Sequence, residues 1–476
     1  MGTGAGKSTQ LHLLNSMPES SRESIHKRWE PVSVPLASLV ALGCLGLVQS
    51  RWPKALSTRP VDMVSGFIPT RPRLDTSARI AALRDSTEIL QRLDSTKARQ
   101  DRIRKLLTDT VGLVPIEDPQ RLQGVFQALK DGKKVRVAWF GDSFIEGDIL
   151  VQDVRDILQK VFGGKGVGFL PATSVTAQFR QSIHHTFSDD WDEVSIVSRP
   201  EGREPGITGH AFFPVLTHDS DKASWIELKA ASRSGSASFD RVRILYSDSK
   251  DTAARVQCAD RQLPMVAGAG LHEAICQAKG TSQLRLRFLT GDSVTVHGVS
   301  VEGDTAGILV DNFSFRGNSG TGLLRIPTEA LKQTNRLLGG YDLIVLEYGT
   351  NVTDAAMPGF QWYGKKLDEV IAHLRQAFPR ADFLIVGVGD RGSREGEEIV
   401  SNPSVAKILE VQRQVARRDG AAFWDLRQAM GGENSMGEWS RAGLASEDYT
   451  HISPGGGRRL GKAFAKAFLK AWEKAR

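Results

Sequence analysis

Four short segments, far apart in the chain, carry the residue types needed for nucleophilic catalysis at a serine. Ser143 lies in FGDSF, Asn351 in EYGTN, and both Asp448 and His451 in DYTH. A serine hydroxyl becomes a nucleophile when a neighbouring base takes its proton, and an imidazole titrates in the right range to do so. A carboxylate near that histidine can orient the ring and stabilise its cation. We therefore predict that Ser143 is the nucleophile, His451 the base and Asp448 the orienting carboxylate.

The same chemistry needs hydrogen-bond donors for the negatively charged oxygen of the tetrahedral intermediate. The predicted donors are the backbone amides of Ser143 and Gly317, the latter in NFSFRGNSG, and the side-chain amide of Asn351. Gly320 lies close to Gly317 and is the alternative glycine. This mechanism requires no cofactor, and no Cys or His spacing suggests a zinc site, so we expect neither a metal nor a cofactor.

Each segment also has an ordinary structural explanation. Asp142 or Ser143 could simply cap a helix, and an asparagine after a strand often forms a turn. The DYTH segment could be a helix cap followed by a surface histidine. Their occurrence together, at the ends of predicted strands and before the last helix, favours catalysis over these separate roles.

The elements predicted around these residues would bring them to one place. Residues 134–140 (KVRVAWF) and 341–348 (YDLIVLEY) are apolar runs typical of buried strands, and helical periodicity follows the first of them. The carboxyl ends of parallel strands meet at one edge of a sheet, where Ser143 and Asn351 would lie close together. Further strands at 381–389 and 421–426 alternate with helices at 365–378, 404–420 and 454–475.

Residues 172–304 have a different pattern. Short alternating runs such as SWIELKA and RVRILYS are separated by turns rich in Gly, Ser and Asp, which is typical of antiparallel strands. We therefore predict an antiparallel, β-sandwich-like module inserted into an α/β domain formed by residues 118–171 and 305–476.

The N-terminal region predicts a membrane anchor. Residues 31–50 form an uncharged run long enough to span a bilayer. We expect residues 1–30 to be a cytoplasmic tail and residues 31–50 a single-pass transmembrane signal anchor. Residues 51–117 would then be a linker with a charged spacer helix over 76–108, which holds the catalytic body away from the membrane or pairs with another helix.

Composition and charge exclude two kinds of partner. The 476 residues carry a net charge of +7, but basic and acidic residues alternate and no nucleic-acid reader motif is present, so no nucleic acid is expected. The stretch from Gly2 to Ser8 is similar to a phosphate-binding loop but has no strand before it, so ATP is not expected either.

The sequence leaves two states open for a pair of cysteines. Cys258 and Cys276 form a disulfide or remain two free thiols.

Taken together, the four segments resemble the GDSL/SGNH hydrolase superfamily, named for its Ser, Gly, Asn and His. The tail FWDLRQAMGGENSMGEWSRAGLASEDYTH is similar to members that act on cell-wall or exported polysaccharides. These include peptidoglycan O-acetylesterases with a carbohydrate-binding-like β module inserted after the GDS segment. The resemblance implies a flavodoxin-like, three-layer α/β/α domain and the catalytic roles given above. One departure is that GTN is followed by VTD, where many relatives have an acidic residue.

We therefore expect a serine esterase that removes O-acetyl groups from an envelope polysaccharide, with peptidoglycan as first choice. It would sit in the bacterial inner membrane with its catalytic body in the periplasm. One alternative is a polysaccharide O-acetyltransferase that uses the same three residues. Another is a non-catalytic scaffold that binds glycans.

Overall fold

The computed structural model describes residues 96–108, 113–198, 203–231, 237–248, 253–289 and 293–475. The expected cytoplasmic tail, the membrane anchor, most of the linker and the stretch from Gly2 to Ser8 lie outside these residues. Over the described ranges, no helix has the length and apolar character needed to cross a membrane.

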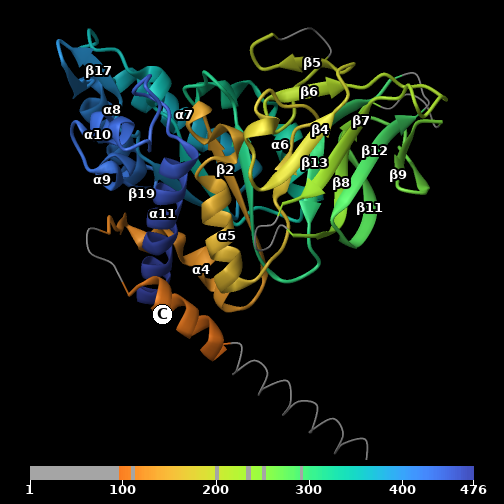
Figure 1. The fold of residues 1–476 in the computed structure, drawn as a ribbon, viewed down its shortest axis with the longest axis horizontal. Helices are drawn as coiled ribbons and strands as arrows, with labels where there is room; N and C mark the ends of the chain where they lie inside the picture. Colours follow the sequence, from red (N-terminus) through yellow and green to blue (C-terminus); the bar gives the residue numbers. More distant parts are fainter. Residues whose placement is uncertain are drawn as a thin grey trace, which may run out of the picture. The chain divides into compact units, whose positions relative to one another are not determined.

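A six-stranded sheet forms the centre of the α/β part (Figure 1). Five of its strands are parallel, and the short β1 is antiparallel to β19 at one edge. Numbered along the chain, the parallel strands have the order 2-1-3-4-5, which is the flavodoxin-like order and confirms the predicted parallel sheet. From edge to edge the strands are β1 (Ile116–Glu117), β19 (Ala422–Trp424), β16 (Asp382–Val386), β15 (Leu343–Glu347), β2 (Lys134–Gly141) and β14 (Gly307–Ser314).

Helices cover both faces of this sheet because successive side chains of a strand point to opposite faces. Val137 and Trp139 of β2 belong to one buried cluster, whereas Ala138 and Phe140 belong to the other. The helical residues 96–106 also contribute to the first cluster through Ile103, so this part of the predicted spacer helix packs on the α/β body. The first cluster contains α4 (Gln123–Lys130), α5 (Val151–Phe162) and α11 (Pro454–Lys474); the second contains α6 (Thr328–Leu337), α7 (Gln361–Ala377) and α8 (Ser404–Arg418).

Two antiparallel sheets are inserted between α5 and β14, in yellow and green in Figure 1. Their facing residues, such as Ile226 and Ile244, share a third buried cluster, so they form a sandwich. Cys258 and Cys276 are joined by a disulfide, which connects a strand of one sheet to a strand of the other. One sheet contains β10 (Arg261–Pro264), β9 (Arg255–Cys258), β12 (Gln283–Leu289), β7 (Trp225–Ala230) and β4 (Ile183–Phe187); the other contains β11 (His272–Thr281), β8 (Phe239–Ser247), β13 (Thr295–Glu302), β6 (His210–Phe213) and β5 (Asp192–Ser195), with β3 (Gly168–Leu170) paired to β13.

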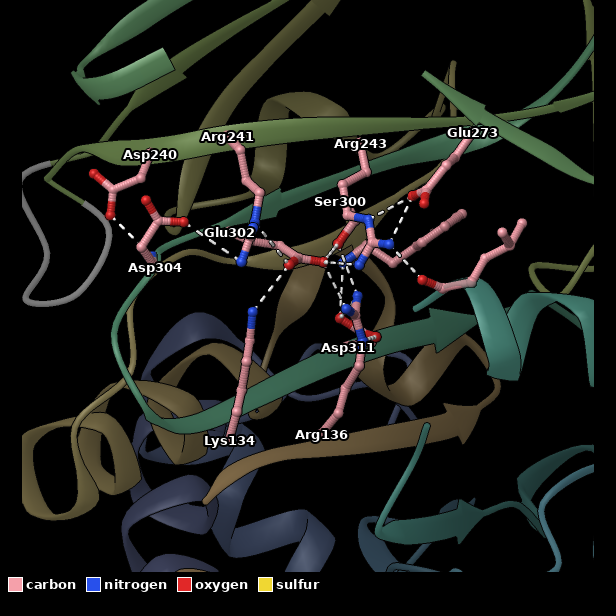
Figure 2. A network of polar contacts seen from close by, with 12 residues as sticks. Lys134, Arg136, Asp240, Arg241, Arg243, Glu273, Ser300, Glu302, Asp304 and Asp311 are labelled. Atoms are coloured by element: carbon pink, nitrogen blue, oxygen red, sulfur yellow. Dashed lines mark hydrogen bonds and ion pairs between the residues drawn. The ribbon is translucent and has the colours of Figure 1, made fainter. Parts of the chain in front are cut away.

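A buried network of charges attaches this module to the parallel sheet (Figure 2). Arg136 on β2 donates hydrogen bonds to Glu302 on β13, at 2.6 Å, and to Asp311 on β14, at 2.7 Å. Lys134 also lies 3.1 Å from Glu302. Burial alone would raise the pKa of Glu302, but Arg136 and Lys134 outweigh it and lower that pKa to about 2. The network therefore fixes the module against the sheet by ionised, mutually compensated groups.

Candidate active site

Ser143 follows the carboxyl end of β2, at the start of a short 3-10 helix, Ser143–Asp148. Asp142 is the N-cap residue of this helix, and its Oδ1 accepts a hydrogen bond from the amide of Phe144 at 2.9 Å. The predicted helix after the strand is present as α5, but it begins only at Val151. The sequence did not predict the turn between β2 and α5. This turn places the side chain of Ser143 at the edge of the sheet.

Ser143, His451 and Asp448 form one hydrogen-bonded chain. The Oγ atom of Ser143 lies 2.8 Å from Nε2 of His451, and Nδ1 of His451 lies 2.6 Å from Oδ2 of Asp448. Burial favours the protonated form of Asp448, but hydrogen bonds from His451 and Thr450 outweigh it and lower the pKa of this carboxyl group. The arrangement can therefore remove the serine proton and stabilise the resulting imidazolium.

The loop that carries Asp448 and His451 is held by its own backbone and by a neighbouring hairpin. Oδ1 of Asp448 accepts hydrogen bonds from the amides of Thr450 and His451, each at 3.0 Å. The amide of Gly392 donates to the carbonyl of Tyr449 at 2.8 Å. The hairpin consists of β17 (Gly392–Glu395) and β18 (Glu398–Ser401), which the sequence analysis did not predict.

Asn351 lies beyond the end of β15, on the same edge of the sheet as Ser143. Its side-chain amide donates to Oδ2 of Asp142 at 3.0 Å and to the carbonyl of Asn318 at 3.1 Å. Both amide hydrogens therefore already have protein acceptors. The hydrogen bond to Asp142 fixes the orientation of this amide. To bind an oxyanion, the amide must therefore share or give up its other hydrogen bond, to the carbonyl of Asn318.

The structure separates the two candidate glycines. Gly317 lines the same pocket as Ser143, and it has a φ of +72°, with nothing within 4 Å of the position of a Cβ atom. Gly320 is buried instead, and a Cβ atom there would lie 3.1 Å from the ring of Tyr348. Gly317 is thus the glycine whose backbone borders the pocket.

Two buried carboxyl groups lie beneath this edge. Burial raises the pKa of Asp142 to about 6, against hydrogen bonds from Phe144 and Asn351 and the charge of His451. Burial also raises the pKa of Glu347 to about 8, against a hydrogen bond from the indole of Trp139. At neutral pH, Asp142 is therefore ionised and Glu347 is protonated.

The pocket around Ser143 has a volume of about 560 Å³. The side chains of His451 and Asp448 are 42% and 49% exposed, so solvent reaches both groups. Several lining residues were not predicted from the sequence, although Arg316 directly precedes Gly317 in the quoted segment. These additional residues are Glu146, Ile149, Thr176, Phe179, Arg316, Thr350, Arg391, Ser446 and Thr450.

The described residues contain no group of three or more His, Cys, Asp or Glu side chains that could hold a metal ion. His184 and His185, adjacent in the sequence, point to opposite faces of β4: His184 is exposed, whereas His185 is buried and lies 3.1 Å from the carbonyl of Ala172. They do not form a ligand pair.

Comparison with known proteins gives a family match for part of the chain and a solved structure with a similar fold. Residues 281–459 match the model of the GDSL-like Lipase/Acylhydrolase family, a range that contains Gly317, Asn351, Asp448 and His451 and begins after Ser143. A solved structure of a peptidoglycan O-acetylesterase has a TM-score of 0.62 at 22% sequence identity, over 75% of this chain and 96% of that one. This likeness shows a common fold. The match confirms the resemblance inferred from the sequence.

More distant structures include a protein from Bacillus subtilis, with a TM-score of 0.27, 16% identity and coverage of 59% of this chain and 88% of that one. An acetylxylan esterase from Geobacillus stearothermophilus also has a TM-score of 0.27, with 18% identity and coverage of 34% and 73%. No curated protein matches the chain.

Proposed function

We propose that this chain, a carboxylic ester hydrolase with a GDSL-like acylhydrolase domain, is a serine O-acetylesterase that acts on an envelope polysaccharide. Peptidoglycan is the first candidate substrate. The observation that carries the proposal is the hydrogen-bonded chain from Ser143 through His451 to Asp448, with distances of 2.8 and 2.6 Å. It borders a pocket that is large enough, at about 560 Å³, for a sugar and its acetyl group.

In the proposed reaction, Oγ of Ser143 attacks the acetyl carbonyl carbon while Nε2 of His451 takes the hydroxyl proton. The oxyanion receives hydrogen bonds from the amides of Ser143 and Gly317 and from the side chain of Asn351. Collapse of the intermediate breaks the ester bond, and His451 gives its proton to the departing sugar oxygen. Water then loses a proton to His451 and attacks the acetyl-serine, which releases acetate and restores the serine.

The exposure of the site favours water over a sugar as the acceptor of the acetyl group. An acetyltransferase must keep water away from its acyl-enzyme, since hydrolysis would compete with transfer. Here the side chains of His451 and Asp448 are about half exposed. Hydrolysis is therefore our first proposal and acetyl transfer the second. A glycan-binding scaffold would not need three polar side chains aligned in one hydrogen-bonded chain.

The proposed substrate and compartment have separate support. The structure with a TM-score of 0.62 belongs to a peptidoglycan O-acetylesterase, and 96% of its length aligns with this chain. The disulfide between Cys258 and Cys276 suits an oxidising compartment. We propose that residues 31–50, which lie outside the described residues, anchor the protein in the bacterial inner membrane with its catalytic body in the periplasm.

The test is acetate release by the full-length protein, solubilised in detergent, beside its Ser143→Ala variant. A small aryl acetate measures ester hydrolysis, and O-acetylated peptidoglycan measures the proposed substrate. Release from both by the wild type alone supports the proposal. Acetate that appears only on a second glycan, with none free in solution, would show acetyl transfer instead. Absence of turnover with both compounds would remove the esterase assignment.

A further inference from the structure

A second cavity, of about 250 Å³, lies beside the catalytic pocket. Both cavities are lined by Glu146 and Arg316, so they adjoin at this pair. Nε and Nη2 of Arg316 donate to Oε2 of Glu146 at 2.9 and 2.7 Å. A ligand that extends from Ser143 across this ion pair enters the second cavity.

The walls of the second cavity come from both parts of the fold. Phe315 and Arg316 follow β14 of the parallel sheet, whereas His210 lies on β6 of the inserted module. The rings of His210 and Phe315 are 4.7 Å apart at 30°, and Nδ1 of His210 lies 2.6 Å from Glu193. The charge network around Arg136 joins the two parts of the fold that supply these walls (Figure 2).

Arg180, in the segment between β3 and β4, also lines this cavity and is only 6% exposed. Buried arginines are normally paired with a carboxylate, because an uncompensated charge is costly to bury. Within the described ranges, the Arg180 guanidinium makes no hydrogen bond or ion pair; its Nε is buried without a partner, and carboxylates act on it only at longer range.

The carboxylate with the strongest attraction for Arg180 is already occupied. Both oxygens of Asp148 accept hydrogen bonds from Arg155, at 2.7 and 3.0 Å, and one also accepts from Ser182 at 2.6 Å. The side chain of Arg180 therefore keeps its fork of donors for another acceptor. An arginine fork matches a carboxylate in shape and charge, and an adjacent aromatic wall suits the apolar face of a sugar.

We propose that this cavity binds a carboxylate of the glycan through Arg180, so that the enzyme prefers acetyl esters on acidic sugars. This inference rests on the proposed function, since the ester lies at Ser143 while the carboxylate reaches Arg180. The carboxylate can belong to the lactyl ether of a muramic residue that carries no peptide, or to a uronic acid. The cavity would recognise the carboxylate, which both sugars carry.

The experiment compares five acetyl esters as substrates of the full-length protein. The first is an O-acetylated muramic-acid oligosaccharide with free lactyl carboxylates, and the second is the same oligosaccharide with those groups converted to amides. The third is an aryl acetate without a carboxylate. An O-acetylated oligouronate and its amide form a second matched pair, which distinguishes the two sources. We expect kcat/KM to be about 10- to 100-fold higher for the acid than for the amide in at least one pair.

Arg180→Met should abolish this preference by raising KM for the acidic substrate, with kcat/KM for the aryl acetate unchanged. Arg180→Lys, which keeps the charge but loses the fork, should retain part of the preference. Arg285→Met is the matched control, because Arg285 pairs with Glu227 outside the cavity lining. Aryl acetate turnover also reports whether each variant is folded.

The wild-type kcat/KM values for the acid and amide substrates test the carboxylate site even where a variant fails to fold. Equal kcat/KM for acid and amide in both pairs would overturn the carboxylate site while leaving the esterase intact. A preference that persists in Arg180→Met would also overturn it. If the wild type hydrolyses none of the five compounds, the proposed function fails, and the carboxylate site fails with it.

Discussion

The side-chain amide of Asn351 donates a hydrogen bond to Oδ2 of Asp142, over 3.0 Å. Oδ1 of the same carboxylate accepts a hydrogen bond from the amide of Phe144, one residue beyond Ser143. A single carboxylate thus positions the turn that carries Ser143 and the amide proposed to bind the oxyanion. A helix cap at Asp142 or Ser143 was the ordinary structural alternative in the sequence analysis, and Asp142 does form such a cap while also orienting Asn351.

Replacement of Asn351 by alanine tests this amide as an oxyanion donor. We expect Asn351→Ala to lower kcat about 100- to 1000-fold with little change in KM, since the donor acts mainly in the transition state. Steady-state kinetics on an aryl acetate measures both constants. An unchanged kcat would show that the amide serves only to hold Asp142 and Asn318.

Replacement of Ser143 by alanine removes the proposed nucleophile, and kcat/KM should fall by about a factor of 10⁶. Ser446→Ala is the matched control, because Ser446 lines the same pocket but its hydroxyl has no described contact with His451. This control should keep most of its activity. Comparable losses in the two variants would mean that the pocket, rather than Ser143, had been disturbed.

Stability should depend on pH through Glu347. Its pKa is about 8 in the folded protein, against an ordinary value of 4.5. Between those two values the folded protein holds a proton that the unfolded chain has released, so the stabilisation is complete below pH 4.5 and is lost as pH rises through 8. Glu347→Gln cannot ionise, and it should therefore lose less stability over this range than the wild type.

Urea unfolding midpoints at several pH values would measure this difference. Asp142 acts in the same direction between 3.8 and about 6, and it remains in both proteins. The comparison of wild type with Glu347→Gln therefore isolates the glutamate. Parallel pH profiles for the two proteins would contradict the assignment.

The disulfide between Cys258 and Cys276 should stabilise the inserted module. The two residues are 18 apart in sequence, and closure of such a loop contributes about 3 kcal/mol in a chain-entropy model. The variant with serine at both positions should unfold at a lower urea concentration. Reductant should lower the midpoint of the wild type but leave that of the variant unchanged, and any other pattern would count against a bond in the native protein.

Disruption of the charge network around Arg136 should lower the free energy of unfolding by more than loss of the disulfide does. Arg136→Met would leave Glu302 and Asp311 buried without their main compensating charge, which typically costs about 3–5 kcal/mol. Glu302→Gln combined with Arg136→Met should recover part of that loss. Unfolding of the wild type, of each single variant and of the double variant measures the coupling, and simple additivity of the single effects would argue against a network.

Much of the fold was predictable because its strands are uninterrupted apolar runs. Residues 134–140 cover β2 except for its last residue, residues 341–348 contain β15, and the final helix predicted over 454–475 ends one residue earlier. The residues near the site were predictable for a related reason. Nucleophilic catalysis at a serine requires particular side chains at the ends of such strands. Ser143 and Asn351 follow two of these strands, and His451 lies in the loop before the last helix.

The sequence pattern did not reveal β14, since Asp311 and Asn312 interrupt its apolar run. Asp311 is fully buried, but its charge is compensated by Arg136 and by a hydrogen bond from Tyr341, partners that are distant in sequence. The hairpin of β17 and β18 was missed because its residues are mostly exposed and polar. The role of Arg180 could not be predicted either, because it depends on which carboxylates other arginines already occupy.

The module is inserted into the connection between β2 and β14. The residues where the chain enters the module lie next to those where it leaves. The amide of Gly303 donates to the carbonyl of Lys165 at 2.8 Å, and the amide of Ile308 to that of Gly163 at 3.0 Å. The end of α5 and the beginning of β14 therefore remain as close as in an ordinary strand-helix-strand unit. An insertion at such a junction adds little loop-closure entropy, so a whole sandwich can be gained or exchanged while the catalytic edge keeps its geometry.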